Sequence, residues 1–471
     1  MLKNLVKLSD STVGRLLKTF FVFGLAISVL MISRSQISDD SLHLLSRGWL
    51  FAAHGIVAPI GNAAAATAGG YVPGSFSAIV TGIPLMLWMD HRAPVVLILI
   101  FHIIAYVLLD RVVKAELGNR ARLILAIVFW LNPWRLYQSG WVDNSNYVFL
   151  AGAVHLWTCY VQRETPKFAA SLIMVVAVGL TLQLHLDAVV LAFASILLWW
   201  RGFWKPHWGG VVLGCVVTVA TLIPFFIEAY HHPEIVPGGG EEPLGSNLIK
   251  VWPVLKGFVY WLRYPSLYAS NSMTVFDFTP AFGISVGPAV TTLFRGFTWT
   301  AGFLALILSV TANTWWFRYM KNPDRQSAVP APASQWLGRY AIWTLAACLI
   351  ANGLSPEVTM WWHNLIILHA AIIPIVLWCD ALLRTPKASM VVKAELSYAL
   401  VTIILCIGMA LGSAHYRRGG SNPVMFLQPE RHQMIEDLGL NQCCISEDVV
   451  WKAKQMYFYR AYLSPYVLPD S

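Results

Sequence analysis

The stretch that decides the fold is Ser38-Asp39-Asp40-Ser41-Leu42-His43-Leu44-Leu45-Ser46-Arg47-Gly48-Trp49, which follows directly on the first apolar run of the chain. Read as a helix, it places four polar residues on one stripe, at steps of three, four and seven: Asp40, His43, Arg47 and His54. Apolar residues fall on the other side, namely Leu42, Leu45, Trp49 and Ile56. We therefore expect a helix in the membrane interface, with its apolar face in lipid and its polar face exposed. The alternative is that Ser38 caps the helix and that Asp39 and Asp40 only favour its dipole.

The composition indicates a protein with several membrane spans. Of its 471 residues, 57% are hydrophobic and only 12% are charged, and the mean hydropathy is +0.59. The charged fraction is about half that of soluble domains, and the apolar residues occur in long runs. A net charge of +9 would suggest a nucleic-acid partner in a soluble protein. In a membrane protein the same charge is typical of basic cytoplasmic loops, so no nucleic-acid partner is expected.

The apolar runs predict an all-α membrane protein with about eleven spans, at residues 19–34, 93–112, 121–134, 145–161, 168–186, 187–200, 209–227, 292–316, 336–354, 361–383 and 394–412. The run from Phe76 to Trp88 is treated differently, because it contains Gly82 and Pro84 and ends at Asp90-His91-Arg92. We expect this run to be an interfacial or re-entrant helix rather than a span.

The basic residues support this arrangement and set its orientation. With the N-terminus inside, the short cytoplasmic segments hold 19 of the 33 basic residues: Lys3, Lys7, Arg15, Lys18, Arg111, Lys114, Arg120, Arg122, Arg163, Lys167, Arg201, Lys205, Arg318, Lys321, Arg325, Arg339, Arg384, Lys387 and Lys393. A further span at 76–88 would place most of these clusters outside. We therefore expect a membrane domain over residues 1–412 with two large outer loops, 35–92 and 228–291, and a small outer tail domain at 413–471.

Polar residues gather at the outer ends of the predicted spans, where ionisable groups are costly and often functional. Five groups fall there: the opening helix, Asp90-His91-Arg92, the segment 132–144, the turn Gln183-Leu184-His185-Leu186-Asp187, and Glu357 with Trp361-Trp362-His363. For any one group a solvated loop or a helix cap is the simpler explanation. Because all five fall on one side of the membrane, we expect a functional site there.

These segments resemble the polytopic C-type glycosyltransferases, and within them the protein O-mannosyltransferase and aminoarabinose transferase branch. The acidic pair Asp39-Asp40 matches the family's pair after the first span, and Tyr137, Gln138-Ser139 and Asp143 match its second outer loop. The segment from Gly61 to Trp88 resembles the glycine-rich stretch and second interfacial helix that follow. Further matches are His185 between two spans, and His363 with Asn364-Leu365-Ile366 and Pro374 at a late helix. The match departs from the family where Asp-Asp replaces the more common Asp-Glu, and where the basic residue of the second loop is displaced to Arg135.

The resemblance implies inverting transfer of a sugar from a polyprenyl-phosphate donor to a glycan, lipid or protein acceptor. It places the protein in the bacterial inner membrane, with the active site facing the periplasm and a role in building cell-envelope glycans. A carboxylate acts as general base, and the candidates are Asp40, Asp39 and Asp143. Basic and imidazole side chains hold the donor or substrate, and the candidates are Arg47, Arg92, Arg135, His43, His185, Lys256, Arg263 and His363. The aromatic residues of the middle loop are expected to stack against sugar faces.

Three other classes stay open from the sequence. One is a non-enzymatic assembly or scaffold protein, which would keep full function with alanine at Asp40. An O-antigen ligase or polymerase also uses a lipid-linked glycan on the outer face, although the acidic pair in the first loop favours the transferase. A secondary transporter would usually show inverted repeats and sites near the membrane midplane. The sequence contains no metal motif and no certain cofactor; a divalent cation is the one candidate.

Overall fold

The computed structural model describes residues 9–33, 35, 39–63, 70–236, 250–265, 277–322, 330, 332–355 and 360–412. Within these ranges, the side chains of Asp39, Asp40, Leu42, Ala63 and Pro280 are not part of the description. Four sequence predictions therefore lie outside the described residues: the cap at Ser38, the polar residue Glu357, the Gly-rich part of the middle loop and the tail at 413–471.

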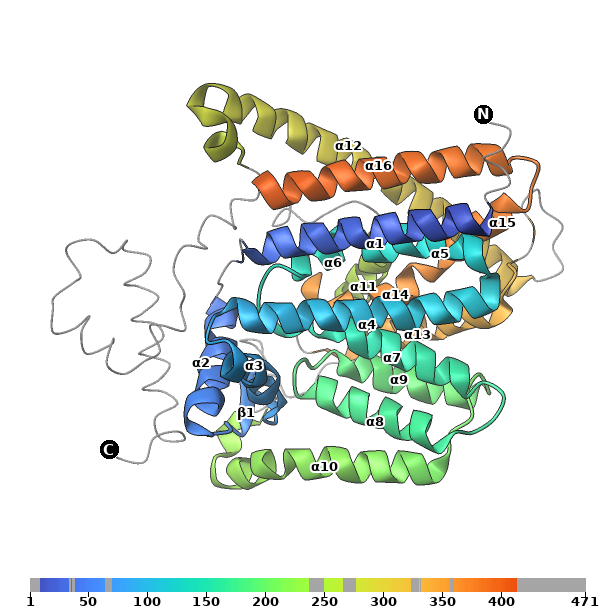
Figure 1. Ribbon diagram of the computed structural model, residues 1–471. Helices are drawn as coiled ribbons and strands as arrows, with labels where there is room; N and C mark the ends of the chain where they lie inside the picture. The colour runs from blue at the N-terminus through green and yellow to red at the C-terminus, as the bar shows by residue number, and fades with distance from the viewer. Residues whose placement is uncertain are drawn as a thin grey trace.

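The described chain is a bundle of long helices that lie side by side (Figure 1). Its longer elements are α1 (Asp10–Ser33), α4 (Arg92–Leu117), α5 (Asn119–Leu125) continued by the π-helix η2 (Ala126–Trp130), α7 (Val148–Val161), α8 (Phe168–Leu182), α9 (Ala188–Trp200), α10 (Trp208–His231), α12 (Thr279–Lys321), α13 (Gln335–Leu354), α15 (Ile373–Leu383) and α16 (Ala388–Gly412). Shorter elements join them: α6 (Pro133–Gln138), η3 (Asn144–Asn146), η4 (Pro233–Ile235), α11 (Val251–Arg263), η5 (Trp362–Ile367) and α14 (Leu368–Ala371).

Each predicted span coincides with one of these helices or with a pair of them. Among the described residues, seven helices are long and apolar enough to cross a membrane: Asp10–Ser33, Arg92–Leu117, Trp208–His231, Ala281–Lys321, Gln335–Leu354, Trp362–Leu383 and Ala388–Gly412. Shorter apolar helices include α8 and α9. The all-α, multi-pass architecture is therefore confirmed, while the count of eleven spans stays a prediction.

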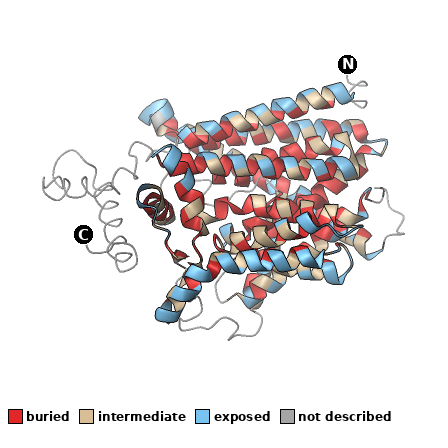
Figure 2. Cartoon of the chain, turned by 60° about the horizontal axis from the view of Figure 1, so that its bottom comes forward, coloured by how far each residue is buried: buried red, intermediate tan, exposed pale blue. Residues whose placement is uncertain are grey.

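Apolar side chains on the outside of the bundle are exposed in the way expected of lipid-facing helices. Figure 2 shows exposed residues along the outward surfaces of the helices and buried residues between them. On α10, for example, Val212 is 61% exposed and Val216 is 58% exposed. Apolar surface of this extent is typical of a protein that lies in a bilayer rather than in water.

A small module sits at one end of the bundle, the end where α1 stops and α4 starts, and we refer to this as the α2 end. The module consists of α2 (Asp39–His54), a two-stranded antiparallel sheet of β1 (Ile60–Ala63) and β2 (Tyr71–Pro73), and α3 (Phe76–Leu87). In Figure 1 the module lies beside the ends of α4 and α8, and α3 does not run along the long helices. This agrees with the prediction that residues 76–88 form no span.

The basic turns gather at the opposite end of the bundle. In Figure 1 the turns between α4 and α5, α7 and α8, α9 and α10, and α15 and α16 all lie at the end away from α2. These turns carry Arg120 and Lys167, Arg201 and Lys205, and Arg384 and Lys387. Charge and architecture therefore agree on one polar axis for the molecule.

The middle segment contains more helix than its sequence suggested. α11 packs against α13, and α12 begins at Thr279, well before the predicted start of the span at residue 292. α11 buries Tyr260 and Trp261, and Tyr264 directly after it is also buried, which leaves these three rings packed inside the protein. These three rings are therefore not available to stack against a sugar, whereas Trp252 is 61% exposed, and for it the prediction stays a prediction.

Candidate functional site

Along the polar stripe of α2, Arg47 is buried, His43 is partly buried and His54 at the end of the helix is exposed. α2 packs chiefly against α3, and its apolar residues Leu44, Leu45 and Trp49 are buried as well. Arg47 is only 1% exposed. At Arg47 and at these apolar residues, the predicted helix with one face in lipid and the other in water is therefore wrong, because the rest of the protein packs against α2.

Arg47 is a buried cation that pairs with no carboxylate among the described residues. Its Nη1 donates a hydrogen bond of 2.8 Å to Oδ1 of Asn62 on β1. Its Nε has no hydrogen-bond partner, and neither has Nδ2 of Asn62. Burial lowers the pKa of Arg47 to about 10, so the guanidinium keeps its charge at neutral pH. The two side chains thus present buried donors with no acceptor, which suits an anion.

His43 lies one turn before Arg47 on the same helix. Burial, and then the charge of Arg47, lower the pKa of His43 to about 4. His43 is therefore neutral at pH 7, and the positive charge of this part of the module comes from Arg47.

The start of α2 is tied to the loop that carries Asp143. The buried hydroxyl of Ser41 donates a hydrogen bond of 2.7 Å to the carbonyl oxygen of Val142. Asp39 and Asp40 form the first turn of α2, just before Ser41, although their side chains lie outside the description. The structure therefore brings together the backbone segments of all three carboxylates that the sequence suggested as catalytic.

Asp143 has a structural role in the described chain. Its Oδ1 accepts hydrogen bonds from the backbone N–H and from the hydroxyl of Ser145, both at 3.0 Å, and so caps η3. Nearby, Gln138 accepts a hydrogen bond from Nε1 of Trp141 at 2.8 Å, while Nε2 of Gln138 is buried without a partner. The loop is held in place by these contacts, and a polar atom in it is left unsatisfied.

Arg92 is already neutralised. Its Nε donates a hydrogen bond to Oδ1 of Asp90, and its Nη2 donates one to Oδ2, both at 2.8 Å. These bonds and the nearby charges hold the pKa of Asp90 below its usual value in spite of burial, which acts in the other direction. A fork-to-fork pair of this kind leaves little charge for a second anion.

Arg135 is fully buried, on the side of η2 that faces α1. Its Nε donates to the carbonyl oxygen of Trp130 at 2.7 Å, its guanidinium lies 4.1 Å from the centre of the Trp130 ring, and Nη2 lies 3.4 Å from the Ser28 hydroxyl. Nη1 has no partner. Burial lowers the pKa of Arg135 to about 9. Arg135 thus contacts η2 through Trp130 and α1 through Ser28, and it holds the end of η2 in place.

A second polar group forms where the turn between α8 and α9 meets η5. The rings of His185 and His363 lie 5.8 Å apart, centre to centre, and Nδ1 of His185 lies 3.3 Å from Oδ2 of Asp187. Burial, and then His363, lower the pKa of His185 to about 3, while burial raises the pKa of Asp187 well above its usual value. The structure thus brings together two of the candidate residues, His185 and His363, that the sequence placed in separate groups.

The two basic residues of α11 lie against aromatic rings. Lys256 Nζ lies 5.9 Å from the centre of the Trp252 ring, and the Arg263 guanidinium lies 5.6 Å from Trp134 and 5.8 Å from Tyr260. The carbonyl oxygen of Arg263 also accepts a hydrogen bond from Nε1 of Trp134 at 3.3 Å. α11 thereby joins Trp134 of the segment 132–144 to α13 and η5, against which it packs.

Sequence reasoning did not assign three polar residues that the structure brings to this end: Asn62, Asp187 and Asn364. Asn62 is the hydrogen-bond partner of Arg47, Asp187 lies beside His185, and Asn364 directly follows His363. Asp187 and Asn364 stand in quoted segments, so their chemistry was visible, but their burial depends on packing between distant segments. Asn62 gave no signal in the sequence.

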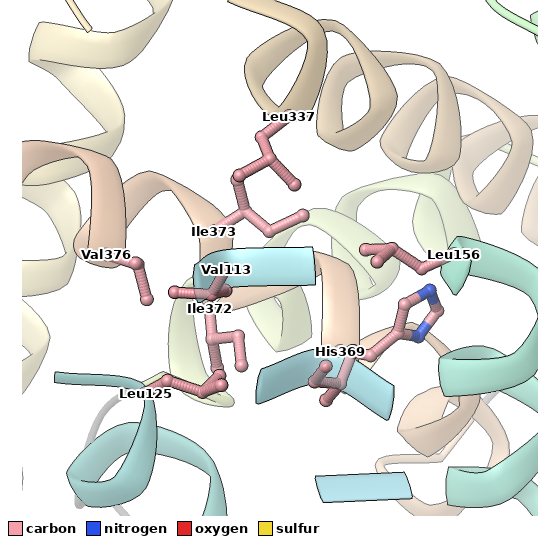
Figure 3. Close-up of a pocket in the computed structure, with 9 residues that line it drawn as sticks. Val113, Leu125, Leu156, Leu337, His369, Ile372, Ile373 and Val376 are labelled. Atoms are coloured by element: carbon pink, nitrogen blue, oxygen red, sulfur yellow. The ribbon is translucent and has the colours of Figure 1, made fainter. Parts of the chain in front are cut away.

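No group of three or more His, Cys, Asp or Glu side chains in the described ranges could hold a metal ion. A narrow cavity elsewhere in the bundle is lined by Leu109, Val113, Leu125, Leu156, Leu337, His369, Ile372, Ile373 and Val376 (Figure 3). Both ring nitrogens of its one polar residue, His369, already lie within hydrogen-bond distance of protein atoms, the Ile366 carbonyl oxygen at 2.8 Å and the Tyr340 hydroxyl at 2.9 Å. This cavity therefore offers nothing to a phosphate or a sugar.

Comparison with solved structures finds membrane glycosyltransferases. ArnT from Cupriavidus metallidurans bound to undecaprenyl phosphate aligns with a TM-score of 0.52 and 12% identity, over 96% of this chain and 89% of that one. The apo form of the same protein gives a TM-score of 0.53 with 12% identity, over 96% and 88% of the two chains. The Archaeoglobus fulgidus oligosaccharyltransferase complex with Zn and sulfate gives 0.50 with 13% identity, over 95% of this chain and 57% of that one.

Neither family models nor curated sequences match the chain. The likeness to the solved structures extends over nearly the whole chain, and at this level of identity it is a likeness of fold. The protein is therefore a multi-pass membrane protein with the fold of the C-type glycosyltransferases that its sequence resembles.

Proposed function

We propose that the protein is a membrane glycosyltransferase that moves a sugar from a polyprenyl-phosphate donor to an acceptor at the α2 end. The observation that carries this proposal is Arg47, a buried cation with an unsatisfied Nε beside the unsatisfied amide of Asn62. Such a pair suits a phosphate, because guanidinium groups bind two phosphate oxygens at once. The fold supports the same class, since ArnT was solved with undecaprenyl phosphate bound.

In this proposal Asp40 is the general base. Asp40 precedes Arg47 by seven residues, or about two helical turns, on the stripe that the sequence predicts. The Ser41–Val142 hydrogen bond supports a site in this region, because it joins the first turn of α2 to the loop of Asp143. The acceptor hydroxyl gives its proton to the carboxylate as its oxygen attacks the anomeric carbon of the donor. The bond from that carbon to the phosphate oxygen breaks, and the polyprenyl phosphate leaves with inversion at the sugar.

The leaving phosphate is a weak base, so it needs stabilisation of charge rather than a strong acid. Arg47 is the best-placed basic residue for that task, because Asp90 neutralises Arg92 and Arg135 is held by the helices. The active site would face the periplasm in the predicted orientation.

The test is transfer by Asp40→Asn and Asp39→Asn, with expression and donor binding measured in parallel. Asparagine keeps the size and the capping ability of aspartate but cannot take a proton. If Asp40 is the base, transfer by Asp40→Asn falls about 10²–10⁴-fold, while donor binding is nearly unchanged and Asp39→Asn stays closer to wild type. Near-normal turnover in both variants would end this assignment, because a helix cap alone contributes about 1 kcal/mol or less of stability.

The product of the reaction separates this proposal from the ligase or polymerase alternative. A transferase of this kind moves the sugar of a single polyprenyl-phosphate donor, whereas a ligase moves a complete glycan. Mass spectrometry of lipids that co-purify with the protein identifies which donor the protein carries.

A further inference from the structure

The polar group at the turn between α8 and α9 is not used by the proposed chemistry of Asp40 and Arg47. Oδ2 of Asp187 is a buried atom without a hydrogen-bond partner. The backbone N–H of Asp187 donates to Nδ1 of His185 at 3.3 Å, so Nδ1 of that ring is taken. Asp187 therefore offers an acceptor, or when protonated a donor, that the protein does not satisfy.

Asn364 on η5 supplies the complementary atom. Its Oδ1 accepts hydrogen bonds from Nδ2 of Asn352 at 2.8 Å and from Sγ of Cys348 at 3.2 Å. Its Nδ2 has no partner, although the residue is only 2% exposed. A fully buried amide N–H₂ without an acceptor is costly, so it calls for a ligand atom or a water.

These two residues belong to the same neighbourhood. Oδ2 of Asp187 lies 3.3 Å from Nδ1 of His185, and the ring of His185 lies 5.8 Å from that of His363, the residue directly before Asn364. η5 packs against α9, which begins directly after Asp187, and against α13, which carries Cys348. The turn and η5 thus bring an unsatisfied acceptor and an unsatisfied donor into one region, around the rings of His185 and His363.

Two histidines lie in the same region, and each accepts a backbone hydrogen bond at Nδ1. Nδ1 of His363 accepts a hydrogen bond from the backbone N–H of Met360 at 3.1 Å, as Nδ1 of His185 does from Asp187. Because burial lowers the pKa of His185, its ring is neutral, and with Nδ1 as an acceptor it carries its proton on Nε2. No lysine or arginine in the described chain forms an ion pair with Asp187, so this group does not suit a phosphate. A carboxyl, an amide and two imidazoles suit hydroxyl groups, which both donate and accept.

We infer that Asp187 and Asn364 bind hydroxyl groups of the donor's sugar and so determine which sugar the protein accepts. This inference rests on the proposed function, since it assigns the phosphate of the same donor to Arg47. Asp187 accepts a hydrogen bond from a sugar hydroxyl, and Nδ2 of Asn364 donates one to a sugar oxygen. A site built around hydroxyl groups rejects a ligand that lacks them, because its polar atoms are then buried without partners.

The test compares binding of sugar-free undecaprenyl phosphate with binding of the same lipid carrying glucose, mannose or arabinose. Binding to purified protein in nanodiscs is followed by intrinsic tryptophan fluorescence. The variants are Asp187→Asn and Asn364→Asp, which keep side-chain size while exchanging an acceptor for a donor or a donor for an acceptor. The matched control is Asp110→Asn, which removes a carboxylate that pairs with Arg122 in a different part of the bundle.

We expect the wild-type protein and Asp110→Asn to bind at least one sugar-bearing lipid about tenfold more tightly than the sugar-free lipid. Asp187→Asn and Asn364→Asp should lose that preference while binding the sugar-free lipid within about twofold of wild type. The inference is overturned if the variants keep the preference, if both lipids weaken equally, or if wild type binds all four lipids alike, as expected when only a water occupies the site. If wild type binds none of the lipids, the proposed function itself fails.

Discussion

Arg47 and Arg92 are chemically identical side chains in opposite surroundings. Arg92 is joined to Asp90 through two hydrogen bonds and is partly exposed. Arg47 is buried and pairs with no acidic side chain in the described part of the chain. Burying a cation is unfavourable unless it is paired, and in our proposal the donor's phosphate supplies the pairing charge for Arg47.

We therefore expect Arg47→Lys to weaken binding of undecaprenyl phosphate by about tenfold or more, because lysine keeps the charge but loses the planar fork. Arg92→Lys is the matched control, and it should change binding by less than about twofold because Asp90 already occupies that guanidinium. Equilibrium binding with the purified variants gives the answer. A larger loss in Arg92→Lys than in Arg47→Lys would assign the phosphate to Arg92 instead.

The low pKa of His43 predicts how the stability of the protein depends on pH. In the unfolded chain His43 takes up a proton near pH 6.5, but in the folded protein its pKa is about 4. Between these values the unfolded state binds more protons, so stability falls as the pH falls from about 6.5 to about 4. The thermal midpoint of wild type should therefore drop more between pH 7 and pH 4.5 than that of His43→Gln. Equal losses would show that His43 is not held neutral.

The residue chemistry of this site was visible in the sequence, but its surroundings were not. The spacing of His43 and Arg47 predicted their common stripe, because helical period is a local property. Their burial depends on α3 and on Asn62, which lie on separate segments of the chain. The sequence therefore predicted that His43 and Arg47 share one side of α2, but it predicted that this side is exposed, whereas Arg47 is buried.

At the scale of elements, α2 and α3 are held together by a glycine contact. A Cβ at Gly48 would lie 2.7 Å from Cγ2 of Thr81 on α3, and a Cβ at Gly82 would lie 2.6 Å from the carbonyl oxygen of Gly48. The two helix backbones are thus too close for a side chain to fit between them.

Gly48→Ala should consequently push α2 away from α3, at a cost of about 1–3 kcal/mol, and lower both the thermal midpoint and phosphate binding. Gly296→Ala is the matched control, because Gly296 lies in the helix α12 with nothing within 4 Å of its Cβ position. Alanine there should be neutral or slightly stabilising, since it favours helix. A Gly48→Ala protein as stable as Gly296→Ala would contradict the close packing.

The long apolar helices were predictable because each forms a continuous run, whereas α11 was not recognised. Its buried residues Pro253, Gly257, Tyr260 and Trp261 recur at helical spacing, so the signal was present in the sequence. This helical spacing was hard to recognise because the segment is short and contains Lys256 and Arg263 among its aromatic residues. The turn-like Gly and Pro residues before it favoured a loop.

At the scale of the whole molecule, the bundle has one end with the candidate site and another with the basic turns. The distribution of charge predicts that the α2 end faces away from the cytoplasm. Single cysteines in a cysteine-free background test this: His54→Cys and His231→Cys at the α2 end, Lys205→Cys and Lys387→Cys at the other. All four positions are exposed. A membrane-impermeant maleimide should label the first pair in intact spheroplasts and the second pair only after lysis. The reverse pattern would invert the orientation.

The hairpin of the module rests on the bundle through two glycines, Gly70 and Gly74. Both have positive φ angles, 70° and 93°, which other residues rarely adopt. A Cβ at Gly70 would lie 2.6 Å from the carbonyl oxygen of Val236, and a Cβ at Gly74 would collide with the side chain of Gln183. Backbone angle and available space therefore exclude a side chain independently at each position. In related sequences whose module packs against α8 and η4 in the same way, we expect glycine at these two positions even where the surrounding residues differ. Where either glycine is replaced, we expect the hairpin to pack against the bundle in a different position.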